Sequence, residues 1–118
     1  MPLILKDKVD VSQPEWAKRL KSLVKKCTDA GPVAKIFVFG SFARGEMTDA
    51  SDLDVAVILP DGEDIKAFRA RLERPLCDWP MDLVVVHQSR YDARKDFGGV
   101  LFEVKSDGIE LYPTWRLK

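Results

Sequence analysis

Three short runs of apolar residues constrain the fold of this chain most strongly. They span residues 35–39, 53–59 and 81–86, and polar or turn-forming residues bound each of them. Apolar runs of about four to eight residues between turn signals are typical of strands that are buried on both faces. A strand of that kind needs helices packed over it. The sequence therefore predicts an α/β (α+β) protein, a β-sheet with flanking helices.

A helical pattern precedes the first run. Residues 12–15 (Ser-Gln-Pro-Glu) predict a capping box in which Ser12 is the N-cap and Glu15 lies in the first turn. Apolar residues then recur on one helical face, and Gly31 and Pro32 end the helix. The residues of that face are Trp16, Leu20, Leu23, Val24 and Cys27.

Further elements complete the pattern. Residues 64–74 and 89–106 are predicted to be helical, the second with a break near Gly98, and residues 109–112 form a last strand. The predicted order is α-β-β-α-β-α-β. Because no repeat or linker divides the 118 residues, we expect a single domain over residues 1–118.

Composition excludes several classes of protein. The 19 basic and 19 acidic side chains give no net charge, which argues against bulk electrostatic binding of nucleic acid or of a membrane. Residues 1–7 are too short and too charged for a signal peptide, and no apolar run approaches the ~18 residues of a membrane span. A cytoplasmic protein is expected. Cys27 and Cys77 form no metal or redox motif, and reduced thiols are the simpler interpretation than a disulfide.

The charge is unevenly distributed along the chain. Residues 40–64 contain one basic and seven acidic side chains, whereas the remaining residues contain 18 basic and 12 acidic ones. A local excess of carboxylates suits a site that attracts divalent cations. The basic remainder suits a polyanionic nucleotide or an acidic partner.

Two of these carboxylates open the second apolar run. Asp52 and Asp54 are two residues apart at the start of a predicted strand, so both side chains project from one face. Like charges beside a buried strand repel each other, and a bound Mg²⁺ would remove that penalty. An isolated Asp-x-Asp pair is, however, more often a solvated strand end.

A third carboxylate strengthens the metal hypothesis. Asp82 opens the next apolar run, and on a neighbouring strand it would face Asp52 and Asp54 across ~4.8 Å. Three converging carboxylates can form a two-metal site for phosphoryl displacement. Asp78 is a weaker candidate for the third position, because it lies in a connector bounded by prolines.

A possible anion cradle precedes the carboxylates. Gly40 and Ser41 end the first strand, where backbone N–H groups at the start of a short helix could hold a phosphate. Arg44 could direct its guanidinium at the same anion, and Gly45 permits the following turn. The segment lacks the Walker pattern, so its value lies in its position ten residues before the Asp-x-Asp pair.

Together these motifs resemble the signature of the DNA polymerase beta-like nucleotidyltransferase superfamily. The run Gly-Ser-Phe-Ala-Arg-Gly at residues 40–45 and the run Ser-Asp-Leu-Asp-Val-Ala-Val at residues 51–57 are similar to its stand-alone branch, the minimal nucleotidyltransferases. The resemblance covers about residues 15–112. It implies a mixed sheet with flanking helices, two Mg²⁺ ions (Mn²⁺ being an alternative) and a nucleoside triphosphate, with ATP as the family's usual choice.

The resemblance also implies roles for individual residues. Gly40 and Ser41 would hold the β- and γ-phosphates, and Arg44 would be a further phosphate contact. Asp52 and Asp54 would bind both metal ions. Asp82 would bind the catalytic metal and help to deprotonate the attacking hydroxyl group. A nucleoside monophosphate would be joined to the acceptor, and pyrophosphate would leave.

The acceptor stays open. Larger relatives bind acceptors with additional helical domains, and we expect no counterpart of these domains within the 118 residues. In the minimal branch, members serve as antitoxins of helical HEPN-domain ribonucleases, which some of them modify with AMP on a tyrosine. We therefore expect AMP transfer to a HEPN-like partner. The alternatives are a non-catalytic module that masks a helical partner, and an oligomeric enzyme that modifies RNA ends or a small molecule.

Two other features are ambiguous in the sequence. His87, the sole histidine, follows the third predicted strand and is better explained as a polar strand end than as a ligand contact. The aromatic tail, residues 112–118, is either a docking element or a packed or frayed terminus, and the second is favoured.

Overall fold

The computed structural model of the protein describes residues 7–118, so the prediction about a signal peptide in the first seven residues lies almost entirely outside them. The elements follow the predicted order, with the short helix that starts at Ser41 and the helix at 89–106 divided in two. They are α1 (Pro14–Ala30), β1 (Lys35–Phe39), α2 (Ser41–Arg44), β2 (Leu53–Leu59), α3 (Ile65–Arg71), β3 (Met81–His87), α4 (Gln88–Arg94), α5 (Gly99–Asp107) and β4 (Ile109–Tyr112).

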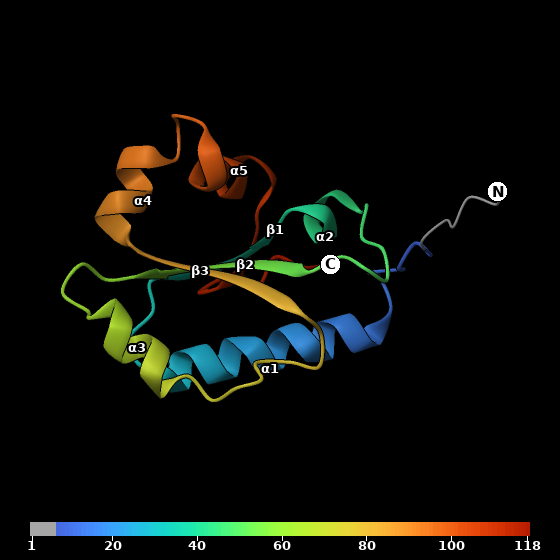
Figure 1. Ribbon diagram of the computed structural model, residues 1–118, viewed down its shortest axis with the longest axis horizontal. Helices are drawn as coiled ribbons and strands as arrows, with labels where there is room; N and C mark the ends of the chain where they lie inside the picture. The colour runs from blue at the N-terminus through green and yellow to red at the C-terminus, as the bar shows by residue number, and fades with distance from the viewer. Residues whose placement is uncertain (1–6) are drawn as a thin grey trace.

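The strands form one mixed sheet in the order β3-β2-β1-β4 (Figure 1). β1 is antiparallel to both β2 and β4, whereas β2 and β3 are parallel. The predicted mixed sheet with flanking helices is therefore confirmed. The parallel pair is important for the site, because it places the beginnings of β2 and β3 at the same edge of the sheet.

Helices cover both faces of the sheet, as the apolar runs predicted. α1 and α3 lie on one face, and α4 and α5 lie on the other (Figure 1). Side chains of β2 alternate between these layers. Leu53, Val55 and Val57 join the α1 side of the core, whereas Ala56 and Ile58 pack with α4 and α5.

The start of α1 differs from the prediction. The helix begins at Pro14 after Gln13, and no side chain caps its first turn. The Ser12 hydroxyl instead donates a hydrogen bond to Asp10 over 2.6 Å, so the predicted capping box is wrong. The predicted apolar face is otherwise confirmed, with Trp16, Leu20, Leu23 and Cys27 buried and Val24 packed beside them.

The other boundaries shift slightly. α3 is shorter than predicted and ends at Arg71, because Leu72 turns to an extended conformation as the chain enters the connector to β3. Asp64 caps α3, its side chain accepting a hydrogen bond from the Ala67 amide over 3.1 Å. The break predicted near Gly98 separates α4 from α5.

Three further predictions are answered by the described residues. Cys27 and Cys77 are both free thiols, as expected. The tail packs on the molecule, with Trp115 and Leu117 against the α1 side of the core. Within residues 7–118, no helix is both long and apolar enough to cross a membrane.

Candidate functional site

Asp54 and Asp82 lie directly opposite each other on neighbouring strands. In the parallel register of β2 and β3, Leu53 pairs with Met81 and Asp54 with Asp82. Paired residues of adjacent strands stand about 4.8 Å apart and point to the same face. That face is the one covered by α4 and α5, since Ala56 and Ile58 follow Asp54 at alternate positions. The two carboxylates therefore meet at the edge where both strands begin.

Gly40 brings the phosphate-cradle motif against the same carboxylate. Its φ of 69° lies in the left-handed region that favours glycine. A Cβ atom at this position would stand 2.2 Å from Oδ2 of Asp54, closer than any side chain permits. Gly40 is therefore required both for the turn from β1 into α2 and for the close approach of Asp54. Ser41, the first residue of α2, follows directly.

The surroundings of Asp54 disfavour its charged form. Partial burial raises the pKa of its carboxyl group, and the negative charges of Asp82, Glu103 and Asp52 raise it further, while Arg44 opposes them. A cation placed among these carboxylates would lower the pKa again. The electrostatics thus favour a bound cation.

Arg44 is held by carboxylates. Its Nε donates to Glu46 over 2.9 Å, and its Nη1 donates to Glu103 and Asp107, each over 3.3 Å. These contacts attach α2 to α5. The side chain remains 40% exposed, and its Nη2 donates to no described residue. The sequence predicted Arg44 as a phosphate contact, and a phosphate would have to share or replace these partners.

Glu103 and Asp107 were not predicted from the sequence. They lie four residues apart on α5, so they project from one face of the helix. Nothing in their local sequence distinguishes them from solvent-exposed helix charges. Their place at the site depends on the packing of α5 against β1, a tertiary contact that no motif predicts.

Of the other residues considered from the sequence, Asp52 lies near Asp54, whereas Asp78 and His87 have partners elsewhere. Asp52 is exposed and precedes β2, near enough to Asp54 to raise its pKa. Asp78 accepts a hydrogen bond from Arg19 of α1 over 2.6 Å, which removes it from the site. The His87 ring contacts the carbonyl oxygen of Glu63 over 2.5 Å, which agrees with its interpretation as a polar strand end.

A metal ion would find an incomplete set of protein ligands here. Among residues 7–118, no three His, Cys, Asp or Glu side chains are arranged to hold a metal ion. Mg²⁺ in nucleotide sites is commonly held by about one or two carboxylates together with substrate phosphates and water. The adjacent Asp54 and Asp82 carboxylates fit that requirement, with Asp52 as a further oxygen donor nearby.

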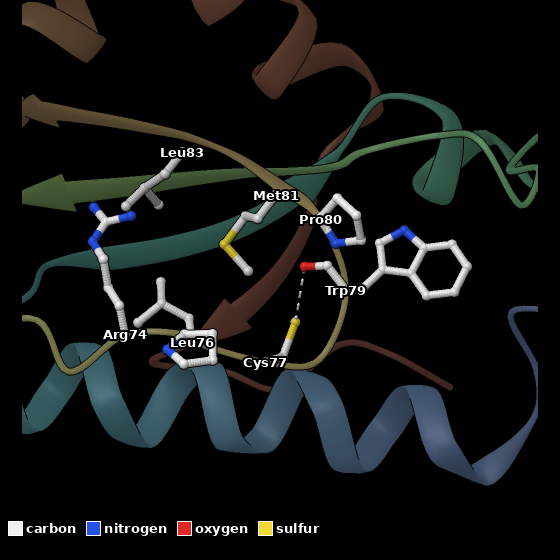
Figure 2. A pocket seen from close by; sticks show the side chains of 8 residues that line it. Arg74, Leu76, Cys77, Trp79, Pro80, Met81 and Leu83 are labelled. Carbon is white, nitrogen blue, oxygen red and sulfur yellow. Dashed lines mark hydrogen bonds between the residues drawn. The ribbon is translucent and has the colours of Figure 1, made fainter.

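A separate cavity of about 470 Å³ lies on the opposite face of the sheet (Figure 2). Met81 and Leu83 of β3 line one side, and the connector before β3 lines the other. Figure 2 shows Cys77 and Trp79 of this connector, with the Cys77 thiol 3.8 Å from the Trp79 carbonyl oxygen. The lining is mostly apolar and contains none of the predicted catalytic residues.

Comparison with known proteins assigns the chain to a family. The profile of the nucleotidyltransferase domain matches residues 20–110, most of the chain and all of the site described above. The chain belongs to this family. The resemblance noted in the sequence is thereby confirmed, and the family supports a transferase. No curated protein sequence matches the chain.

Two solved structures resemble this nucleotidyltransferase domain. A candidate nucleotidyltransferase from Sulfolobus solfataricus has a TM-score of 0.55 at 18% identity, over 81% of each chain. It supports the fold alone. A toxin–antitoxin crystal structure with AMP-PNP has a TM-score of 0.55 at 26% identity, over 80% of this chain and 73% of that chain.

Proposed function

We propose that this protein is a Mg²⁺-dependent nucleotidyltransferase that transfers AMP from ATP to a hydroxyl group of a partner protein. The observation that carries the proposal is the pairing of Asp54 with Asp82 beside Gly40, in a chain of the nucleotidyltransferase family. This arrangement joins the two halves of the motif at one edge of the sheet.

Each residue has a role in the proposed reaction. Gly40 and Ser41 bind the β- and γ-phosphates, and Arg44 contributes the free Nη2 of its guanidinium. Asp82 accepts the proton of the acceptor hydroxyl group, whose oxygen forms a bond to the α-phosphorus. The bond from that phosphorus to the bridging oxygen breaks, and pyrophosphate leaves.

Asp52, Asp54 and Asp82 would hold the Mg²⁺ ions, with Mn²⁺ as an alternative. When bound, the ions supply Lewis-acid stabilisation of the negative charge on the attacking and leaving oxygens. Asp54 is the most constrained of these ligands, because Gly40 and the strand register fix its position.

A second protein is the proposed acceptor, and a HEPN-like helical protein is the specific candidate. The 26%-identical neighbour is described as a toxin–antitoxin with AMP-PNP, that is, with a partner and a nucleotide analogue. By analogy we propose that the present chain acts as an antitoxin in a two-component module.

Transfer can be tested with ATP labelled on the α-phosphorus, Mg²⁺ and either the purified product of the adjacent gene or cell lysate. We expect label on the adjacent-gene product, and a loss of about 100-fold or more in Asp54→Asn and Asp82→Asn. Asp78→Asn is the matched control, because the carboxylate of Asp78 is paired with Arg19 away from the site. Label on RNA ends or on a small molecule would contradict the protein acceptor.

Two observations favour a second function. Arg44 is neutralised by three carboxylates, and residues 7–118 contain no ready group of three metal ligands. A non-catalytic module that binds nucleotide and masks a helical partner would need neither an unpaired Arg44 nor a complete set of metal ligands. If the Asp52→Asn, Asp54→Asn double variant still neutralises the co-expressed partner fully, masking rather than transfer is the biological role.

A further inference from the structure

The exposed large apolar side chains of the described residues gather in one short segment. Phe97 is 79% exposed, Val100 44% and Phe102 43%. All three lie within six residues, where the α4–α5 connection leads into α5. This connection forms the outer tip of the layer opposite α1 (Figure 1). Exposed apolar groups concentrated in this way mark interaction surfaces more often than isolated ones do.

The segment adjoins the candidate active site through α5. Phe102 immediately precedes Glu103, whose carboxylate contacts Arg44 and raises the pKa of Asp54. Leu101 and Val104 anchor the same helix in the core. A protein bound to the outer side of this helix would therefore lie on the face of the sheet from which Asp54 and Asp82 project.

Two arginines give the surface its charge. Arg90 and Arg94 are exposed, lie four residues apart on α4, and line a hollow of about 250 Å³ together with Val100. Nearby Lys95 and Lys105 form ion pairs with aspartates, whereas Arg90 and Arg94 form none with any described residue. The surface thus combines apolar anchors with two uncompensated positive charges.

We propose that the α4–α5 surface, formed by Arg90, Arg94, Phe97, Val100 and Phe102, docks the acceptor protein. The proposal rests on the proposed function and names the part of the chain that recognises the partner. The partner surface would present an apolar pocket for Phe97 with acidic residues around it, because aromatic and arginine side chains are typical interface anchors. Docking there would bring the acceptor hydroxyl group to the site from the α5 side.

A second copy of this chain fits the surface less well. A two-fold dimer packs the same surface on itself, which would bring Arg90 and Arg94 of each copy towards those of the other. Like charges at an interface are unfavourable without an intervening anion. The charge pattern therefore favours a different, acidic partner.

Binding of the purified adjacent-gene product by titration calorimetry tests the proposal. We expect Phe97→Ser and Arg94→Glu each to raise the Kd for this protein by about tenfold or more. Arg74→Glu, a charge reversal on the opposite side of the sheet, should bind within about twofold of the wild type. Thermal unfolding and AMP-PNP binding should be unchanged in Phe97→Ser, which shows that the fold and site are intact.

The contradicting results are distinct. The proposal is overturned if Phe97→Ser and Arg94→Glu both bind the adjacent-gene product as tightly as the wild type. It is also overturned if Arg74→Glu weakens this binding as much as they do. The absence of a wild-type complex, a Phe97-dependent homodimer in sedimentation, or Phe97-dependent binding to vesicles of phosphatidylcholine and phosphatidylglycerol overturns it too. If the partner binds through this surface but receives no label, the docking proposal stands and the proposed transfer fails.

Discussion

At the scale of single residues, the site depends on a glycine and a carboxylate that share one space. Gly40 has a positive φ and faces Asp54 so closely that even a methyl group would meet its Oδ2 atom at 2.2 Å. Gly45 also has a left-handed φ of 70°, but a Cβ atom there would meet nothing within 4 Å. Gly45 is thus a left-handed helix cap with open space around it, whereas Gly40 combines a positive φ and a ψ of −145° with the contact to Asp54.

We predict that Gly40→Ala abolishes transfer while Gly45→Ala preserves it. Gly45→Ala should lose about 1 kcal/mol of unfolding free energy, because it places a side chain in the left-handed helical region. Gly40→Ala should lose more, about 1–3 kcal/mol, because its ψ of −145° lies outside that region and its Cβ atom meets Asp54. Only Gly40→Ala forces the Asp54 carboxylate away from its position. Urea denaturation and the transfer assay measure the two effects. Equal transfer by the two variants would show that the contact with Asp54 is unimportant.

Many individual residues of the candidate site could be predicted from the sequence. Gly40, Ser41, Asp54 and Asp82 were predicted because their spacing implied a strand, a turn and a neighbouring strand, and the register places Asp54 opposite Asp82. The partners of Arg44 could not be predicted. Glu46 is a sequence neighbour, but Glu103 and Asp107 are distant residues on α5 that only the packed fold brings to Arg44.

At the scale of elements, α1 is fixed to the sheet by an apolar face that includes a buried thiol. Cys27 is fully buried, and this burial raises the pKa of its thiol from 9.0 to about 12. The unfolded chain loses the proton at lower pH than the folded one does. The contribution of the thiol to stability is therefore complete below about pH 9 and is lost as the pH rises towards about 12.

The Cys27→Ala variant tests this pH dependence. Wild type should be the more stable at about pH 8, and its advantage should shrink by up to about 2 kcal/mol by about pH 10.5, because the alanine variant cannot ionise. Urea denaturation at the two pH values measures the difference. Cys77→Ala, at a half-buried position, serves as the comparison. An advantage independent of pH would contradict burial of the Cys27 thiol.

The second element-scale prediction concerns α5. Glu103 and Asp107 place negative charge beside Arg44 and compete with a triphosphate for it. The Glu103→Gln, Asp107→Asn double variant should therefore bind AMP-PNP about fivefold more tightly at low salt. Calorimetry measures the affinity, and Glu73→Gln, an exposed change outside the site, is the control. Weaker binding would mean that these carboxylates position Arg44 rather than compete for it.

The elements also show why some predictions failed. Strands were predicted to within one residue, because continuous apolar runs with sharp turn signals leave little freedom. The capping box failed because Asp10, two residues before the predicted pattern, accepts hydrogen bonds from the amide and hydroxyl groups of Ser12, and the helix begins after Gln13. α3 ended early because the chain extends at Leu72, before the proline-containing connector.

At the scale of the whole molecule, the net charge is zero, but acidic and basic side chains are concentrated in different places. Acidic residues collect around the start of β2 and β3, where Asp52, Asp54 and Asp82 lie, and unpaired arginines lie on the outer side of α4. Both features occur on the α4–α5 side of the sheet. One layer of the protein thus carries both the candidate catalytic edge and the proposed docking surface.

The most direct test of the central claim compares ATP labelled on the α-phosphorus with ATP labelled on the γ-phosphorus. Each is incubated with the wild-type protein, Mg²⁺ and the purified adjacent-gene product. Nucleotidyl transfer at the Asp54–Asp82 edge predicts that only α-label joins the acceptor, that γ-label leaves as pyrophosphate, and that Asp54→Asn abolishes both results. Label from the γ-phosphorus on the acceptor, or α-label transfer that persists in Asp54→Asn, would contradict the account.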